Sequence, residues 1–123
     1  MAGTLVANTI NTDTGLFSTN NAYSGIAKAW VNYNGSTQTI NNSFNVSSVT
    51  RVGSGDYTVN FSTAMPNANY VFAATAQNTS GVGTFISQKT STTPTTTYCE
   101  FYVVTTAVTL VDTPIFCVTF FGN

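Results

Sequence analysis

The chain has 123 residues, of which 6% are charged, and its formal net charge is −1. A chain of this length forms one domain. Its three Lys and Arg residues are too few to neutralise the phosphates of a nucleic acid. The chain has no histidine, which removes the usual general base near neutral pH and the commonest metal ligand.

Neutral polar side chains take the place of charge at the surface. The sequence contains 24 Thr, 14 Asn and 11 Ser. Hydroxyl and amide groups keep a protein soluble, but they provide little charge repulsion between copies. This composition favours a protein that works inside an assembly or on the outside of a particle. The alternative is a monomer with an unusual surface.

Residues 1–25 differ from the rest of the chain. The segment 4–10 is compatible with an extended strand, and 11–23 is rich in Asn, Thr, Ser and Gly. We predict an extended arm that either covers an edge of the folded domain or pairs with another chain by strand addition, and the composition favours pairing. Its apolar anchors are Leu5, Val6, Ile10, Leu16 and Phe17.

The chain from residue 26 onward shows strand patterns separated by turn residues. A predicted strand over 26–33 ends at the turn dipeptide formed by Asn34 and Gly35. The next strand covers 38–44. Strands over 46–52 and 57–61 flank a glycine-rich turn, which predicts a hairpin.

The second half of the chain continues the pattern. The nearly continuous apolar run at 70–76 predicts a strand that is buried on both faces. Further strands are expected over 84–89, 98–105 and 115–121. About eight strands without a crossover helix predict an all-β domain over 26–123, an antiparallel β-sandwich or jelly roll.

The two cysteines, Cys99 and Cys117, lie in predicted strands, and they could form a disulfide if those strands are neighbours. The N-terminus has neither the basic region nor the apolar stretch of a signal peptide, so we expect synthesis in a cytoplasm and free thiols. The longest apolar runs are too short to span a bilayer, and no membrane insertion is expected.

The carboxylates are few, and they do not suggest catalysis. Asp56 and Asp112 lie in turn-like sequence, where Asp is common for backbone reasons. Glu100 falls within a predicted strand and is expected to mark a solvent or subunit face. Two cysteines and scattered carboxylates match no recognised metal-ligand set. We therefore predict no catalytic residue, no metal and no cofactor, and a protein that is not an enzyme.

Trp30 is the candidate binding residue of the folded domain. It alternates with Lys28 and Asn32, and therefore faces away from Val31 and Tyr33. One interpretation is a tryptophan at the edge of the core. The other is a subunit interface or a platform on which a sugar ring stacks, since aromatic residues are favoured at such surfaces.

Three stretches of the chain, in order, resemble a structural module of marine bacteriophages of the cyanophage and pelagiphage type. The stretches are AKAWVNYNG at 27–35, FNVSSVTRVGSGDYTVNFSTAMPNANY at 44–70 and FCVTFFGN at 116–123. Residues 71–110 depart freely from the module. In that family the module commonly lies at the C-terminus of tail-fibre-like and other virion proteins, which are usually homotrimeric.

The resemblance implies a non-enzymatic virion structural protein that is exposed on the particle surface. Only about 25 residues precede the sandwich, which fits a capsid decoration, knob or cement protein better than a long fibre. The expected partners are further copies in a homotrimer and the major capsid protein or other virion proteins, with the arm gripping the capsid. The alternative is a tail-fibre or tail-tip protein that recognises a host surface glycan.

Overall fold

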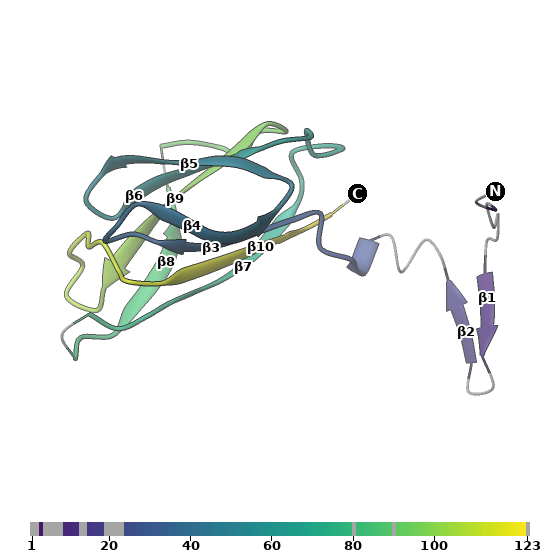
Figure 1. Cartoon of the computed structure of the whole chain (residues 1–123), viewed down its shortest axis with the longest axis horizontal. Helices are drawn as coiled ribbons and strands as arrows, with labels where there is room; N and C mark the ends of the chain where they lie inside the picture. The colour runs from purple at the N-terminus through teal and green to yellow at the C-terminus, as the bar shows by residue number, and fades with distance from the viewer. Residues whose placement is uncertain are drawn as a thin grey trace.

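The computed structural model describes residues 3, 9–12, 15–18, 24–79, 81–89 and 91–122. Eight strands form two antiparallel four-stranded sheets that pack face to face as a β-sandwich (Figure 1). The all-β class and the sandwich of about eight strands are therefore confirmed.

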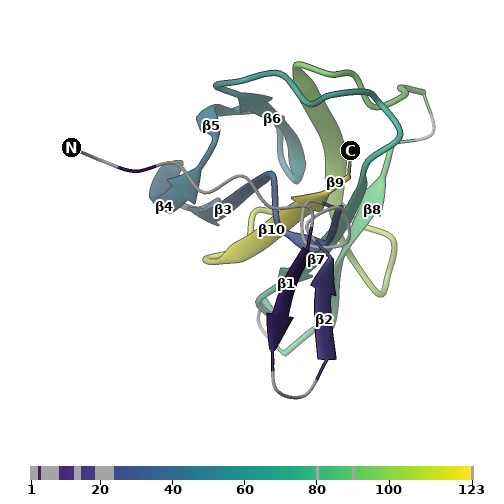
Figure 2. The same cartoon turned by 90° about the vertical axis from the view of Figure 1, so that its right-hand side faces the viewer.

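The two sheets are built from strands that are distant in the sequence. The first sheet has the order β4-β3-β10-β7 and contains β3 (Ala29–Asn34), β4 (Thr39–Phe44), β7 (Val71–Ala76) and β10 (Phe116–Phe121). The second sheet has the order β5-β6-β9-β8 and contains β5 (Val46–Gly53), β6 (Asp56–Phe61), β8 (Thr84–Gln88) and β9 (Tyr98–Thr105). Figure 2 shows β4 and β5 at one side of the sandwich and β7 and β8 at the other. The predicted hairpin is β5 and β6, which pair in antiparallel register.

Aromatic side chains from both sheets fill the core. Phe101 on one sheet and Phe116 on the other are fully buried, with ring centroids 5.5 Å apart and planes at 88°. Phe61 and Phe120 make a second edge-to-face pair at 5.0 Å. Such pairs add about 0.5–1.5 kcal/mol each beyond the burial of their area. The alternation of inward apolar residues in β6, β9 and β10 supplies these contacts.

Asn45 makes the corner at which the chain passes from the first sheet to the second. It has a φ of 54°, a left-handed conformation that Asn tolerates better than most residues. Its Nδ2 donates to the carbonyl oxygens of Lys28 and Thr63, both at 3.0 Å, and its Oδ1 accepts from the Thr63 N–H at 2.7 Å. These bonds fix the end of β4, and with it Phe44, beside the start of β3.

The prediction that 70–76 is buried on both faces is wrong. β7 is an edge strand that pairs only with β10 within the described sheets, and its burial alternates. Val71, Ala73 and Thr75 are exposed, whereas Phe72 packs against the core. The outward positions are filled largely by small residues, so the sequence shows a continuous apolar run although only one face is covered.

Both cysteines are free thiols, the state that the sequence analysis favoured. Cys99 lies in β9 and is fully buried in the core. Cys117 lies in β10, on the other sheet, and is partly exposed. Because the two strands belong to different sheets and Cys117 faces outward, the side chains cannot meet in a disulfide.

The arm contains a short hairpin of β1 (Thr9–Thr12) and β2 (Gly15–Ser18) in place of a single extended strand. Ile10 pairs with Phe17, and Asn11 pairs with Leu16. The hairpin lies apart from the sandwich, beyond the end at which β3 begins (Figure 1). Two predicted anchors, Leu5 and Val6, lie outside the described residues.

Candidate interaction face around Trp30

Trp30 lies on the outer face of the first sheet. Its neighbours Ala29 and Val31 are buried in the core, while Trp30 itself is partly exposed. The direction predicted from alternation is therefore confirmed. What Trp30 contacts outside the chain stays a prediction.

The strand register places large and small residues side by side on this outer face. Trp30 pairs with Phe44 of β4 on one side and with Thr119 of β10 on the other, and Thr119 in turn pairs with Ala73 of β7. Phe44 is 54% exposed. We call this surface the Trp30 face, and its outward residues are Trp30, Asn32, Asn42, Phe44, Val71, Ala73, Thr75, Cys117, Thr119 and Phe121.

A shallow pocket of about 230 Å³ lies between β10 and β7 on the Trp30 face. It is lined by Ala73, Ala74, Thr75, Cys117 and Thr119. These side chains are small, and they lie beside the larger Trp30 and Phe44, which explains the depression. Small-molecule sites usually occupy roughly 300–1,000 Å³, so this pocket suits one side chain or one sugar ring better than a larger ligand.

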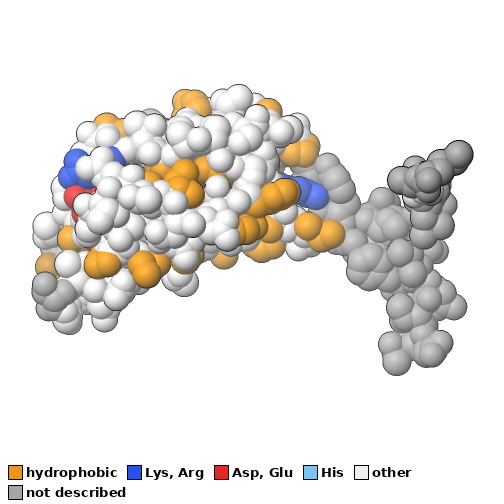
Figure 3. Space-filling model, in the orientation of Figure 1, with side chains coloured by type: hydrophobic (Ala, Val, Ile, Leu, Met, Phe, Trp, Pro, Cys, Tyr) orange, Lys and Arg blue, Asp and Glu red, His pale blue; other side chains and the backbone are white. Residues whose placement is uncertain are grey.

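The Trp30 face has no charged residue among its ten members. Its polar groups are amides, hydroxyls and one thiol, and Asn41 donates to the Oδ1 of Asn32 at 2.9 Å. Hydrophobic side chains are spread over the visible surface, and several lie beside a cationic side chain at the end from which the arm leaves (Figure 3). The face can therefore bind by apolar contact and by neutral hydrogen bonds, and it offers no group for acid–base chemistry.

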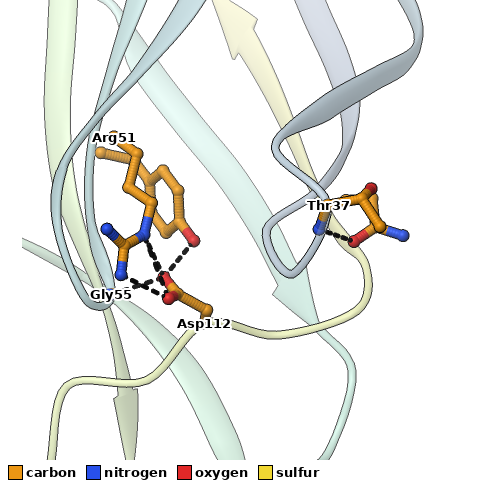
Figure 4. Close-up of polar contacts among 6 residues, drawn as sticks. Thr37, Arg51, Gly55 and Asp112 are labelled. Atoms are coloured by element: carbon orange, nitrogen blue, oxygen red, sulfur yellow. Dashed lines mark hydrogen bonds and ion pairs between the residues drawn. The ribbon is translucent and has the colours of Figure 1, made fainter.

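Asp112 organises the charged cluster at the other end of the sandwich. Its carboxylate accepts hydrogen bonds from Arg51 Nη2 at 2.7 Å, from the Tyr57 hydroxyl at 2.6 Å and from the Gly55 N–H at 3.0 Å (Figure 4). The hydrogen bonds from Arg51 are the main cause that lowers the pKa of Asp112 to about 2, against the opposing effect of burial. This network attaches the loop before β10 to the β5–β6 turn.

A second ion-pair group lies beside the first. Lys89 is buried and pairs with both Asp56 and Glu100, and its ammonium lies 5.2 Å from the centre of the Tyr102 ring. Burial lowers the pKa of Lys89, but the two carboxylates outweigh it and raise the pKa. The Oδ1 of Asp56 is buried, and this ion pair, not a well-formed hydrogen bond, is its polar contact among the described residues.

All three carboxylates of the described residues therefore have cationic partners. Sequence reasoning placed Asp56 and Asp112 in turn-like sequence and Glu100 on an outer strand face. The structure agrees for Glu100, whereas Asp56 is the first residue of β6 and Asp112 lies in the loop before β10. The ion pairs of all three were missed. Arg51 and Asp112 are 61 residues apart, and no local spacing indicates that they meet. The pocket was missed for the same reason, since its walls come from two strands that are distant in sequence.

Two further properties concern only the part of the chain that the structure describes. No group of three or more Cys, Asp or Glu side chains converges there as a set of metal ligands. None of its helical segments has the length and apolar character needed to cross a bilayer.

The fold and the Trp30 face define a small antiparallel β-sandwich with an uncharged aromatic surface on one sheet. Comparison with protein-family models, with curated proteins and with solved structures gave no match to this chain.

Proposed function

We propose that this protein is a non-enzymatic structural component of a bacteriophage particle, exposed on the particle surface as a capsid decoration or cement protein. The observation that carries the proposal is the uncharged Trp30 face, whose aromatic residues Trp30 and Phe44 lie towards the end of the sandwich where the arm begins. A protein with its arm and its exposed aromatic residues towards the same end can attach to a capsid by that end, while the rest of the sandwich projects from the particle.

The charged residues support a structural role. Asp56 and Glu100 pair with Lys89, and Asp112 pairs with Arg51. Carboxylates that are engaged with cationic side chains of neighbouring strands and loops connect parts of the fold, which supports a structural role. A surface of neutral Thr, Asn and Ser also keeps its hydration when the salt concentration changes, as a particle surface requires.

The phage assignment is supported by the three stretches that resemble the marine-phage module. They fall on β3 with its turn, on β5 and β6 with the following loop, and on β10. β3 and β10 are paired in the centre of the first sheet, and Trp30 belongs to the first stretch. The shared residues therefore include the two central strands of the Trp30 face, whereas β7, which forms one wall of its pocket, lies outside them.

A second candidate function is glycan recognition at a phage tail. It is favoured by the partly exposed Trp30 beside a pocket of single-ring size, with amide groups of Asn32 and Asn42 on the same face. Aromatic rings stack on the apolar face of a sugar, and amides bind its hydroxyl groups. In this case the protein would be a tail-fibre or tail-tip protein.

The proposed function is tested on particles of the virus that encodes the chain. Mass spectrometry of purified particles should detect the protein in many copies, and immunogold labelling should place it on the head. Gold confined to the tail would favour the second candidate, and binding to host-surface glycan that is lost in Trp30→Ala would support it. Particles that contain no copy of the chain would contradict both.

A further inference from the structure

We propose that the pocket on the Trp30 face receives Phe17 from the arm hairpin of a second copy of this chain. This inference deepens the proposed function, because it specifies how copies would hold one another on a particle. It assigns an occupant to the pocket and a partner to the hairpin.

The hairpin needs a partner surface. β1 and β2 have four residues each, and they pair mainly with each other. A two-stranded hairpin of this size is at best marginally stable in water, because it has no other layer on which to bury its apolar residues. The hairpin lies away from its own sandwich in Figure 1, so the stabilising surface is expected on another copy.

The arm begins beside the Trp30 face. The Lys28 N–H donates to the Phe120 carbonyl at 2.8 Å, which fixes the chain at the end of β10, and Ile26 just before it is 59% exposed. Residues 19–23 can span roughly 17 Å when extended. That reach lets the hairpin leave its own sandwich and lie on a neighbouring one at the same end.

The pocket and Phe17 match in size and chemistry. The pocket lies below the usual size of a small-molecule site and has no charged residue in its lining. Phe17 is the one aromatic residue of the hairpin sequence. An aromatic side chain entering an uncharged pocket of this size is favoured by apolar contact.

Such an exchange has a defined symmetry. Each copy donates one hairpin and accepts one, which is a head-to-tail contact that closes into a ring when the rotation permits. A closed ring of three is the arrangement that the homotrimer expectation requires. The segment 1–8 before the hairpin would remain for contacts with the shell.

Thiol cross-linking of the full chain tests this directly, because Cys117 lines the pocket and Cys99 is buried. Under mild oxidation, Phe17→Cys should give covalent dimers and trimers, and these should be absent from the double variant that also carries Cys117→Ser. The matched control is Val52→Cys, an exposed apolar position near the C-terminal end of β5, which should give few such species. Equal cross-linking by both variants would overturn the proposal.

A second measurement covers the case in which geometry prevents the cross-link. In the otherwise unaltered chain, Phe17→Asp should raise the alkylation rate of Cys117 several-fold and lower the mass in solution towards that of a monomer. If oxidised Phe17→Cys loses its free thiols but keeps the mass of a monomer, the disulfide has formed within one chain. That result would place the hairpin on its own sandwich and contradict the exchange. If Cys117 stays protected from alkylation in Phe17→Asp, something other than Phe17 fills the pocket, and the proposal is wrong. If both thiol experiments give the contradicting result while the protein is still found on particles, the hairpin exchange is refuted and the proposed function is not.

Discussion

Arg51 and Asp112, 61 residues apart in the chain, form a forked ion pair in which both Nε and Nη2 of the guanidinium donate to the carboxylate. The pair connects the end of β5 to the loop that leads into β10 (Figure 4). Because β10 supplies Cys117 and Thr119 to the Trp30 face, this contact just before the start of β10 supports that face.

Replacing Asp112 should therefore destabilise the whole domain. Asp112→Asn removes the charge that Arg51 requires while it keeps the size of the side chain. About a quarter of the Asp112 side chain is exposed, so solvent weakens the pair, and we expect a loss of about 1–2 kcal/mol. Urea unfolding measures this loss as a lower midpoint. An unchanged midpoint would show that the network contributes nothing.

The same carboxylate makes stability depend on pH in acid. The pKa of Asp112 is about 2 in the folded protein and 3.8 in its ordinary state, so the unfolded chain binds the proton more readily. The stabilisation is complete above about pH 4 and is lost as the pH falls towards 2. Unfolding measured between pH 6 and 2 should show this decline, and the decline should be smaller in Asp112→Asn.

Two glycines of the β5–β6 turn should respond very differently to alanine. Gly55 has a φ of 64°, and a Cβ there would collide with Val111 N and would lie 2.6 Å from the Val103 carbonyl oxygen. A Cβ on Gly53 meets nothing within 4 Å. We expect Gly55→Ala to cost at least about 2 kcal/mol and Gly53→Ala to have little effect. Similar thermal midpoints for the two variants would contradict the observed turn.

Alanine substitutions at Trp30 and Phe116 should have very different effects on stability, because Trp30 lies on the outer face and Phe116 lies in the core. Phe116 is fully buried among aromatic rings, and Phe116→Ala should cost about 3–5 kcal/mol. Trp30→Ala removes a residue from the outer face, and we expect a cost below about 1 kcal/mol in dilute solution. Denaturant unfolding of both variants measures the difference. A large loss in Trp30→Ala would favour the edge-of-core interpretation.

The two thiols differ in environment, and Cys99 should be inert. Burial is the main cause that raises the pKa of Cys99 to about 11, so almost none of it is thiolate at pH 8. In Cys117→Ser, a thiol reagent should label the folded protein very slowly and the urea-unfolded protein rapidly. Fast labelling of the folded variant would show that the core opens at β9.

The strands could be predicted from the sequence because each one alternates or ends at a turn. The predicted strand at 98–105 coincides with β9, and the predicted hairpin is β5 and β6. Strand order could not be predicted, since it depends on contacts between distant segments. Without that order, β7 was taken as buried on both faces, although its run of small apolar residues lies at an edge.

The candidate site was predictable only in part, for a related reason. Alternation alone places Trp30 on the outer face, because it needs no knowledge of neighbouring strands. The pocket needs β10 to lie beside β7, and the Asp112 network needs a loop to return to the β5–β6 turn. The pairing of β1 with β2 could not be predicted either, because Thr, Asn and Gly are common throughout this segment and give only a weak hairpin signal.

Cryo-electron microscopy of intact particles tests the central claim most directly, because it shows where the chain sits and what its arm contacts. The proposal predicts density for the sandwich at three-fold or quasi-three-fold positions of the capsid, with the arm ordered against the shell and against neighbouring copies. Particles whose capsid surface carries no such density, with the sandwich found only at the tail or nowhere, would contradict it.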